Sequence, residues 1–492
     1  MIATNDGLTA FKRVGGVDGS ELVPDLATSL PKPSDGGRTY VFRVRTGIRY
    51  SNGRIVRPAD FRYSLERLFA LHSVGTYLYA GIRGAAQCER RPVRCDLGRG
   101  VVTDDDAGTV TFHLVAPDPD FPDKLALPFV MAVPVGTPMR KMIVPATGPY
   151  VIASYAPTRQ LELQRNPRFR EWSKAAQPDG YPDEVIWKFV VKDQPKVTAV
   201  ERGEADWLAD IPPRNRLTEL RTQYASQLNT SFSSVTQYLF LNTRLPPFND
   251  IRVRKALNYA INRSVVARLW GGPELARPTC QVLPPSFPGY SRYCPYTRHP
   301  TVAGAWSGPD LAQARRLVAA SHTKGTRVRV WSYNQPPWAD MARYTAALLN
   351  RLGYRATTKR IKPSDYPQTI LDSRNKAQIG HFAWGADFPR ASNFFTPNLT
   401  CRSFRPHSPS NLNAAQFCNH KIDAEIKNAL AQELTNPEGT SRLWAKIDRD
   451  VVDEAPWVPL YTPAQPDFLS KRTGNYQFSP QWGVLLDQLW VR

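Results

Sequence analysis

Long hydrophobic runs are missing from this 492-residue sequence. Because no stretch of 18 or more residues is continuously apolar, no segment has the composition of a membrane-spanning helix. Met1 leads directly into IATNDGLTAF, which has neither the charged start nor the apolar centre of a secretory signal peptide. We therefore expect either a cytoplasmic chain or one whose true N-terminus lies upstream of Met1 or was cut away.

The familiar catalytic motifs are also missing. The sequence has no G-x-x-x-x-G-K-[ST] phosphate loop, no H-E-x-x-H, no G-x-S-x-G and no dinucleotide fingerprint. Its seven histidines are scattered, and none pairs at the spacing of helical metal ligands, so surface or packing roles explain them. Asp104, Asp105 and Asp106 precede Gly108 in a hairpin-like segment, which is typical of a solvated turn. We predict no enzyme, no cofactor and no metal site.

Acidic residues are few compared with basic ones. There are 43 Asp and Glu against 64 Lys and Arg, a formal net charge of +21. The basic residues are spread along the chain, with only short groups such as Arg252, Arg254 and Lys255. Diffuse positive charge raises solubility and favours anionic surfaces, including an acidic membrane face. Since no nucleic-acid recognition module accompanies the charge, we predict no nucleic-acid partner.

Six cysteines form three local pairs along the sequence, which are Cys88 with Cys95, Cys280 with Cys294, and Cys401 with Cys418. Each pair encloses a short, turn-rich segment that has few other means of being held in place. Six cysteines allow about 15 connectivities, and buried free thiols are an alternative. A zinc site is less favoured, because there is no Cys-x-x-Cys spacing. Disulfides would indicate an oxidising compartment.

The first half of the chain mixes strands and helices. Alternating apolar residues predict strands at 39–46 and 109–115, and Pro58 opens a helix with Phe61, Leu65, Leu68 and Phe69 on one side. Further strands are predicted at 149–155, after a turn at 156–159 where Leu161 and Leu163 alternate with polar neighbours, at 185–191 and at 236–243.

The second half alternates helices and strands. Asp250 is the expected N-cap of a helix, and Gly353 is the expected C′ glycine of a helix at 338–352. Such alternation indicates a parallel or mixed open sheet. The other expected elements are strands 326–333, 354–361, 377–384 and 455–462, and helices around 311–318, 364–372, 420–434 and 438–453.

The segment AQIGHFAWGADFPRASNFFTPNL, residues 377–399, is the most informative for function. An apolar strand ends at Trp384. The small residue Gly385 leaves space at the strand end, and Asp387 follows before Phe388. Ligands of open α/β sheets lie outside the carboxyl ends of strands. Asp387 could therefore meet a ligand cation and Trp384 could supply an apolar wall or a cation–π face. The alternative is an aspartate that caps the loop beside a core tryptophan.

This segment resembles a region of the extracytoplasmic solute-binding proteins of family 5, the peptide- and nickel-binding components of ABC importers. Other matches follow in the expected order over nearly all of the chain. They are residues 22–69 with Tyr63-Ser-Leu-Glu-Arg67, the Gly148-Pro-Tyr hairpin with its Arg165-Asn-Pro turn, FNDIRVRKALNYAINR, AWGADFPRASNFF and APWVPLY.

The resemblance implies an α/β, two-lobed periplasmic-binding-protein-like fold (type II, cluster C) with an extra subdomain in the first lobe. We predict lobe I at 1–243, lobe II at 244–458 and a return to lobe I at 459–492, with hinge strands near 236–243 and 455–462. In peptide-binding members, an Asp at the position of Asp387 meets the ligand's α-amino group and a Trp at that of Trp384 lines the pocket. The predicted ligand-binding residues are Asp387, Trp384, Gly385, Phe388 and Tyr238. The Cys401–Cys418 pair resembles a disulfide of dipeptide-binding relatives.

The resemblance also implies the function. We expect a non-enzymatic receptor of an ABC importer that captures a small peptide or other amine-bearing solute in a cleft between the lobes and delivers it to membrane permease subunits. We expect an extracytoplasmic monomer that is peripheral to the membrane, in the periplasm or as a cell-surface lipoprotein. The family's signal peptide and first strand, which precede the segment matching DGLTAF, are expected to be absent here. The alternative function is a ligand-sensing module of a regulatory protein.

Overall fold

The chain folds into two compact units. The computed structural model describes residues 2–189, 193–285, 287–408 and 411–492. Unit 1 comprises Met1–Asn229 together with Asp467–Arg492, and unit 2 comprises Thr230–Pro466. The chain therefore leaves unit 1 once, builds unit 2 from one continuous stretch, and returns.

In the first part of unit 1, a three-stranded antiparallel sheet packs with helix α1 (Pro58–Ala70). The strand order is β3 (Thr39–Arg43), β5 (Thr109–His113) and β4 (Val101–Asp104). The predicted alternation is confirmed, because Phe42 and Phe112 are buried and their rings meet edge to face with centroids 5.7 Å apart. The predicted helix is confirmed as well, since Pro58 occupies its first turn and its apolar side is buried.

The rest of unit 1 consists of small sheets and short helices. The predicted hairpin forms from β6 (Tyr150–Ala156) and β7 (Gln160–Arg165), and β8 (Glu184–Lys188) pairs with β7. The strand predicted at 185–191 partly lies outside the described residues. The other elements are β1 (Thr9–Phe11), β2 (Leu22–Pro24), α2 (Ala85–Arg90), α3 (Phe121–Lys124), α4 (Asp193–Glu201), β9 (Trp207–Leu208), α5 (Arg214–Gln223), β17 (Thr473–Gly474), β18 (Phe478–Ser479), β19 (Gly483–Val484) and β20 (Trp490–Val491).

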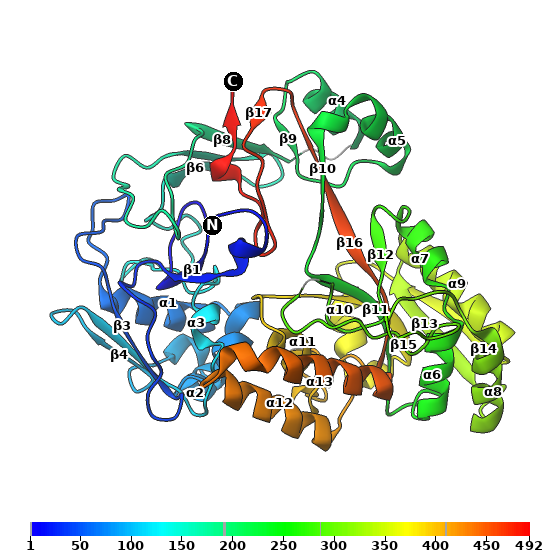
Figure 1. Ribbon diagram of the computed structural model, residues 1–492. Helices are drawn as coiled ribbons and strands as arrows, with labels where there is room; N and C mark the ends of the chain where they lie inside the picture. The colour runs from blue at the N-terminus through cyan, green and yellow to red at the C-terminus, as the bar shows by residue number, and fades with distance from the viewer. Residues whose placement is uncertain (1, 190–192, 286, 409–410) are drawn as a thin grey trace. The chain divides into compact units, whose positions relative to one another are not determined.

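A mixed sheet forms the centre of unit 2 (Figure 1). Strand β13 (Arg327–Tyr333) pairs in parallel with both β14 (Arg355–Ile361) and β15 (Ile379–Gly385). Strand β11 (Val235–Leu241) is antiparallel to β15 and to β16 (Trp457–Leu469). The order β10-β16-β11-β15-β13-β14 includes β10 (Leu228–Phe232), and β12 (Ala276–Pro278) pairs with β16. The predicted mixed sheet is confirmed.

Helices cover both faces of this sheet. One hydrophobic cluster joins Leu239, Val328 and Val330 to α6 (Ile251–Ala260), α7 (Arg263–Trp270), α8 (Leu311–Ser321) and α9 (Trp338–Arg351). A second cluster joins Tyr238, Phe240 and Trp331 to α10 (Tyr366–Leu371), α11 (Ser392–Leu399), α12 (His420–Glu433) and α13 (Ser441–Glu454). Both predicted helix ends hold, because Asp250 accepts a hydrogen bond from the Arg252 amide and Gly353 has a φ of 99°.

The units divide at β10 and in the second half of β16. The boundaries expected from the sequence, 243/244 and 458/459, both fall inside unit 2. The reason is that β11 is a central strand of the unit 2 sheet, and β16 extends well beyond the strand expected at 455–462, as far as Leu469. One long strand thus belongs to both units.

Three disulfides join the three local cysteine pairs. The Cα atoms of Cys88 and Cys95 are 4.3 Å apart, those of Cys280 and Cys294 are 5.2 Å apart, and those of Cys401 and Cys418 are 4.2 Å apart. The predicted pairing is confirmed, and the alternative of free thiols is wrong. Among the described residues, no helix combines the length and the apolar composition that crossing a membrane requires.

Candidate ligand site at the end of strand β15

The predicted site residues lie on and just after strand β15, in unit 2. Trp384 stands opposite Thr236 of β11, and Gly385 stands opposite Val235. The chain then leaves the sheet through residues 386–391 and enters α11 at Ser392. A side chain in this connection lies beyond the carboxyl end of β15, which is where open α/β sheets bind ligands.

Asp387 is held in this connection by Asn393. The Asp387 backbone N–H donates to Asn393 Oδ1 at 2.9 Å, and Asn393 Nδ2 donates to Asp387 Oδ2 at 3.1 Å. Asn393 is only 3% exposed, whereas Asp387 is half-buried. The reciprocal contacts orient the carboxylate from a rigid base in the first turn of α11. Sequence reasoning missed Asn393, although a polar residue in the apolar stretch ASNFF was a usable signal.

Trp384 and Tyr238 project from the same face of the sheet. Tyr238 is directly opposite Phe382, and Trp384 is two residues further along β15. Tyr238 is fully buried, with its ring stacked on Trp457 at a centroid distance of 3.6 Å. Burial raises the pKa of the Tyr238 hydroxyl well above its ordinary value, so the group stays neutral. Trp384 is half-buried and packs against the same core cluster.

Two polar atoms on this face lack a partner among the described residues. Trp384 Nε1 and the Tyr238 hydroxyl are both buried and make no hydrogen bond with another described group. Buried polar groups are nearly always hydrogen-bonded, so unpaired ones need a further partner such as water or a ligand. Both atoms can donate, which suits a carbonyl oxygen.

The remaining predicted residues have different surroundings. Gly385 is exposed, and a Cβ added there would lie 3.0 Å from Val235 Cγ2. Phe388 is 2% exposed, so its ring is part of the protein interior. The structure therefore brings Trp384, Gly385 and Asp387 together at the strand end, with Tyr238 and Phe388 as buried residues behind them.

A polar pair on the opposite face of these strands was not singled out by the sequence. His381 is 2% exposed, both of its ring nitrogens are buried, and neither has a hydrogen-bond partner among the described residues. Burial lowers the pKa of His381 from 6.5 to about 3. Gln237 lies diagonally across on β11, and its Oε1 is also unpaired within the described part of the chain. The packing role expected for the histidines fits His381.

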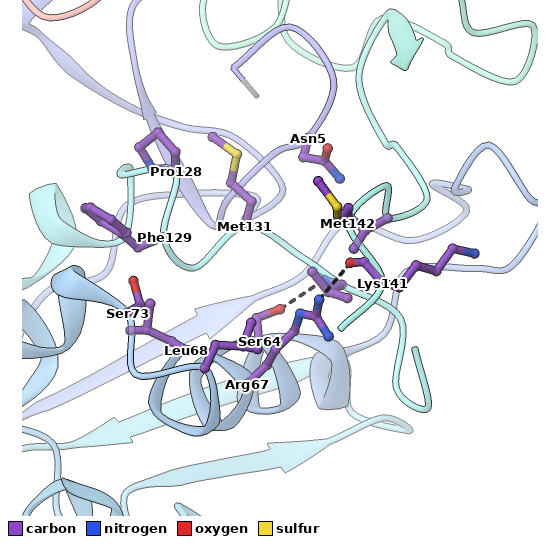
Figure 2. A pocket seen from close by; sticks show the side chains of 13 residues that line it. Asn5, Ser64, Arg67, Leu68, Ser73, Pro128, Phe129, Met131, Lys141 and Met142 are labelled. Atoms are coloured by element: carbon purple, nitrogen blue, oxygen red, sulfur yellow. Dashed lines mark hydrogen bonds between the residues drawn. The ribbon is translucent and has the colours of Figure 1, made fainter. Parts of the chain in front are cut away.

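Unit 1 contains a separate apolar pocket of about 280 Å³, shown in Figure 2. Two of its polar side chains, Ser64 and Arg67, already have partners. Ser64 Oγ donates to the Asp60 carbonyl and accepts from the Val133 amide, while Arg67 donates to the carbonyls of Pro138 and Lys141. Figure 2 shows Phe129, Met131 and Met142 around the same space. None of the predicted site residues lines it.

A comparison with protein families decides the identity. The model of the bacterial extracellular solute-binding proteins, family 5 Middle, matches residues 21–405. The chain belongs to this family.

Two similar proteins are named for the solutes that they bind, which are glutathione for one and di- and tripeptides for the other. The chain is 23% identical to the glutathione-binding protein GsiB of Salmonella typhimurium, a match that covers 97% of this chain and 88% of the relative. It is 24% identical to the di/tripeptide-binding protein 2 of Pseudomonas aeruginosa, over 93% of this chain and 84% of the relative.

Solved structures of similar proteins confirm the fold. The clavulanic acid biosynthesis oligopeptide binding protein 2 has a TM-score of 0.87 and 24% identity, covering 99% of this chain and 90% of that one. DppA from Helicobacter pylori, solved in complex with the peptide STSA, has a TM-score of 0.76 and 18% identity, covering 99% and 92%. The expected mixed α/β, two-lobed periplasmic-binding-protein fold is therefore confirmed.

Family membership also settles the broad role. As an extracellular solute-binding protein of family 5, the chain acts outside the cytoplasm as a solute receptor. The expectation of a cytoplasmic chain, which was one of the two drawn from the first residues, is therefore wrong. The similarity to binding proteins supports the receptor and not the alternative of a regulatory sensing module.

Proposed function

We propose that the protein is the receptor of an ABC importer for small peptides or related amine-bearing solutes. In this proposal Asp387 receives the α-amino group of the solute, and Trp384 forms an apolar wall beside it. The observation that carries the proposal is the Asp387 carboxylate, oriented by Asn393 just beyond the carboxyl end of β15. The names of the relatives support a peptide ligand, since they include glutathione- and di/tripeptide-binding proteins.

The chemistry of Asp387 suits an ammonium group. A carboxylate that accepts a hydrogen bond from an ammonium gains more than a neutral acceptor would, because the charges add to the hydrogen bond. Hydrogen bonds to charged groups contribute roughly 1.5–3 kcal/mol. An orienting partner such as Asn393 reduces the entropy that Asp387 loses when the solute binds.

Two donors on the Trp384 face of strands β11 and β15 suit the rest of a peptide. Trp384 Nε1 and the Tyr238 hydroxyl are buried and have no partner among the described residues. A peptide carbonyl, directly or through a bridging water, would supply the acceptor that they need. The indole ring of Trp384 would meanwhile contact an apolar part of the solute. Receptor and solute would then satisfy each other's polar groups.

Calorimetric titration tests the proposal with a panel of di- and tripeptides and their N-acetylated counterparts. The wild type should bind free-amine peptides, and Asp387→Asn should weaken that binding by about 10- to 100-fold, which corresponds to the loss of a charged hydrogen bond. Asp365→Asn is the control, because Asp365 is an exposed carboxylate of the same unit, near α10. Equal binding of free and acetylated peptides would show that Asp387 is not an amine anchor. Failure of every peptide to bind would reject the ligand class.

The proposal includes the partners expected of such a receptor. The loaded protein would dock on permease subunits and release its solute, without a chemical step of its own. It would be a monomer that is peripheral to the membrane. Analytical ultracentrifugation checks the monomer, and incubation of solute with protein followed by mass spectrometry checks that the solute leaves unchanged.

A further inference from the structure

A second pocket in unit 2, of about 380 Å³, lies at the opposite end of the sheet from the candidate solute site. It opens where the parallel strands β13 and β14 begin, beside the connection that leads into β15. Four cationic side chains line it, together with the neutral donors Thr357 and Asn375. The four cations are Arg327, Arg329, Arg355 and Lys376. No Asp or Glu is among the lining residues.

The register of the parallel strands concentrates the positive charge on one face. Arg327 is paired with Arg355, and Arg329 is paired with Thr357. The intervening residues Val328 and Ala356 point to the other face, where they belong to the hydrophobic cluster with α9. Because side chains alternate along a strand, both paired arginines and Arg329 share the face that lines the pocket.

Helix α10 covers the far end of the sheet face that carries Arg327 and Arg329, and leaves the beginning of the strands uncovered. Trp331 lies on the same face, two residues beyond Arg329, and is buried in the cluster that includes Tyr366 of α10. The Tyr366 hydroxyl donates to the Trp331 carbonyl at 3.1 Å. The arginines at the start of the strands are exposed, in contrast to Trp331. The sheet face is thus covered at one end and lined with cations at the other.

The four cations are electrostatically uncompensated. None of them forms an ion pair with another described residue, and Arg327 and Arg355 are direct cross-strand neighbours of like charge, which is destabilising. Nearby arginines differ in this respect. Arg374 is paired with Asp372 at 2.6 Å, so that carboxylate is already engaged.

The backbone beneath the cations is firmly held. Gln378 Oε1 accepts from the Arg329 amide at 2.9 Å, and Gln378 Nε2 donates to the carbonyls of Arg327 at 3.1 Å and Pro246 at 2.7 Å. The start of β13 is therefore fixed before its pairing with β15 begins at Val330 and Ile379. A rigid base keeps the arginines together in spite of their repulsion.

We propose that this pocket binds the phosphate group of an anionic ligand, separately from the solute site. The guanidinium groups of Arg327 and Arg355 can each present two parallel N–H donors to phosphate oxygens, an arrangement that a point charge such as Lys376 complements. Thr357 and Asn375 add neutral donors. The phosphate could come from a free anion or from the headgroup of an anionic phospholipid, and both present the same oxygens.

Two arms of one experiment distinguish these sources. The first titrates the full chain with inorganic phosphate by calorimetry at low salt. The second measures co-sedimentation with vesicles of phosphatidylglycerol and phosphatidylcholine, against vesicles of phosphatidylcholine alone. The test variant is the double substitution Arg327→Gln/Arg355→Gln. The control is Arg315→Gln/Lys427→Gln, which removes the same charge from exposed positions of unit 2 outside the pocket.

We expect the test variant to lose at least tenfold in affinity and the control to stay within twofold of the wild type. Binding of phosphate alone supports a free anion, and binding of the acidic vesicles supports the lipid headgroup. The test variant should also unfold at a higher temperature than the wild type in phosphate-free buffer, since it lacks the repulsion. Absence of binding in both arms, or an equal loss in the control, would overturn the proposal.

Discussion

Asp387 and Asn393 hold each other through two hydrogen bonds that run in opposite directions. The Asp387 amide donates to the Asn393 side chain at 2.9 Å, and the Asn393 side chain donates back to the Asp387 carboxylate at 3.1 Å. The pair closes the loop between the end of β15 and the first turn of α11. Because Asn393 is almost completely buried, the carboxylate is oriented from the core and not from solvent.

Replacing Asn393 should therefore weaken the proposed amine site without touching the solute. Asn393→Leu removes both hydrogen bonds, and we expect the ratio of affinities for a free-amine dipeptide and its N-acetylated form to fall by about 5- to 20-fold, or roughly 1–2 kcal/mol. Calorimetry measures both affinities. Asn398→Leu is the control, as Asn398 is also buried on α11 but contacts Phe394. If both variants change the ratio equally, Asn393 has no positioning role.

Gly380 allows β15 to lie against its neighbours. A Cβ at this position would lie 2.8 Å from both Phe240 Cε1 and the Tyr366 hydroxyl oxygen. Gly380→Ala should lower the free energy of unfolding by about 1–3 kcal/mol, because overpacking forces side chains or backbone to move. Chemical denaturation measures the change. Gly325→Ala is a poor control because of its positive φ, so the exposed Ala312→Ser serves instead and should change stability by less than about 0.5 kcal/mol.

Arg13 and Asp487 form an ion pair inside unit 1, with side chains that are 3% and 2% exposed. Asp487→Ala leaves the guanidinium buried without its counter-charge, and we expect a loss of about 3–5 kcal/mol in the free energy of unfolding. The double variant Arg13→Met/Asp487→Leu should recover part of this loss, because it leaves no unpaired guanidinium, although Asp6 also loses the attraction of Arg13. Denaturant titration compares the two.

An exposed ion pair provides the contrast. Arg165 and Asp179 are 36% and 56% exposed, so Asp179→Ala should cost less than about 1 kcal/mol. A loss from Asp487→Ala as small as that from Asp179→Ala would mean that the Arg13 pair contributes no more than a surface contact.

His381 should make the protein less stable in mild acid. The folded protein keeps the imidazole neutral down to about pH 3, whereas the unfolded chain takes up a proton near pH 6.5. Between these values the unfolded state binds the additional proton, so stability falls as the pH falls, by up to about 1.4 kcal/mol per pH unit. The contribution is fully present above pH 6.5 and decreases toward pH 3.

The variant His381→Leu separates this effect from that of buried carboxyl groups, which change the free energy of unfolding with pH in the opposite direction. Burial raises the pKa of Asp448 to about 7 and that of Asp6 to about 6, so these groups favour the folded state as the pH falls. The difference in unfolding free energy between wild type and His381→Leu should change with pH between about 3 and 6.5 and be constant above. A difference that does not vary with pH would refute the buried, neutral imidazole.

Local signals predicted much of the fold correctly. The N-cap at Asp250 and the helix opened by Pro58 depend on residues close in sequence, and the alternation of apolar residues in β3 and β5 can be read within each strand. The unit boundaries were placed less accurately. Strand β11 (VTQYLFL) is buried over most of its length, but its sequence does not show that β15 and β16, which are distant in the chain, pair with it inside unit 2.

Some residues of the candidate site could also be located from the sequence, whereas the surroundings of others could not. Asp387 and Trp384 could be located because an apolar strand ends there and because the segment resembles a known family. Tyr238 and Phe388 proved to be buried. Asn393 was missed because its position before two phenylalanines signals a buried polar side chain but does not show which group that side chain contacts.

Local rules in the sequence therefore determined where strands, helix caps and paired cysteines lie, because those features depend on neighbouring residues. Only the tertiary structure decided which strands pair and in which register. Register sets Arg327 against Arg355 across two parallel strands, and it places Tyr238 behind Trp384. The physical reason is that pairing between distant segments depends on the buried surface and the backbone hydrogen bonds of the whole sheet. A short stretch of sequence does not contain the free energy of all these contacts.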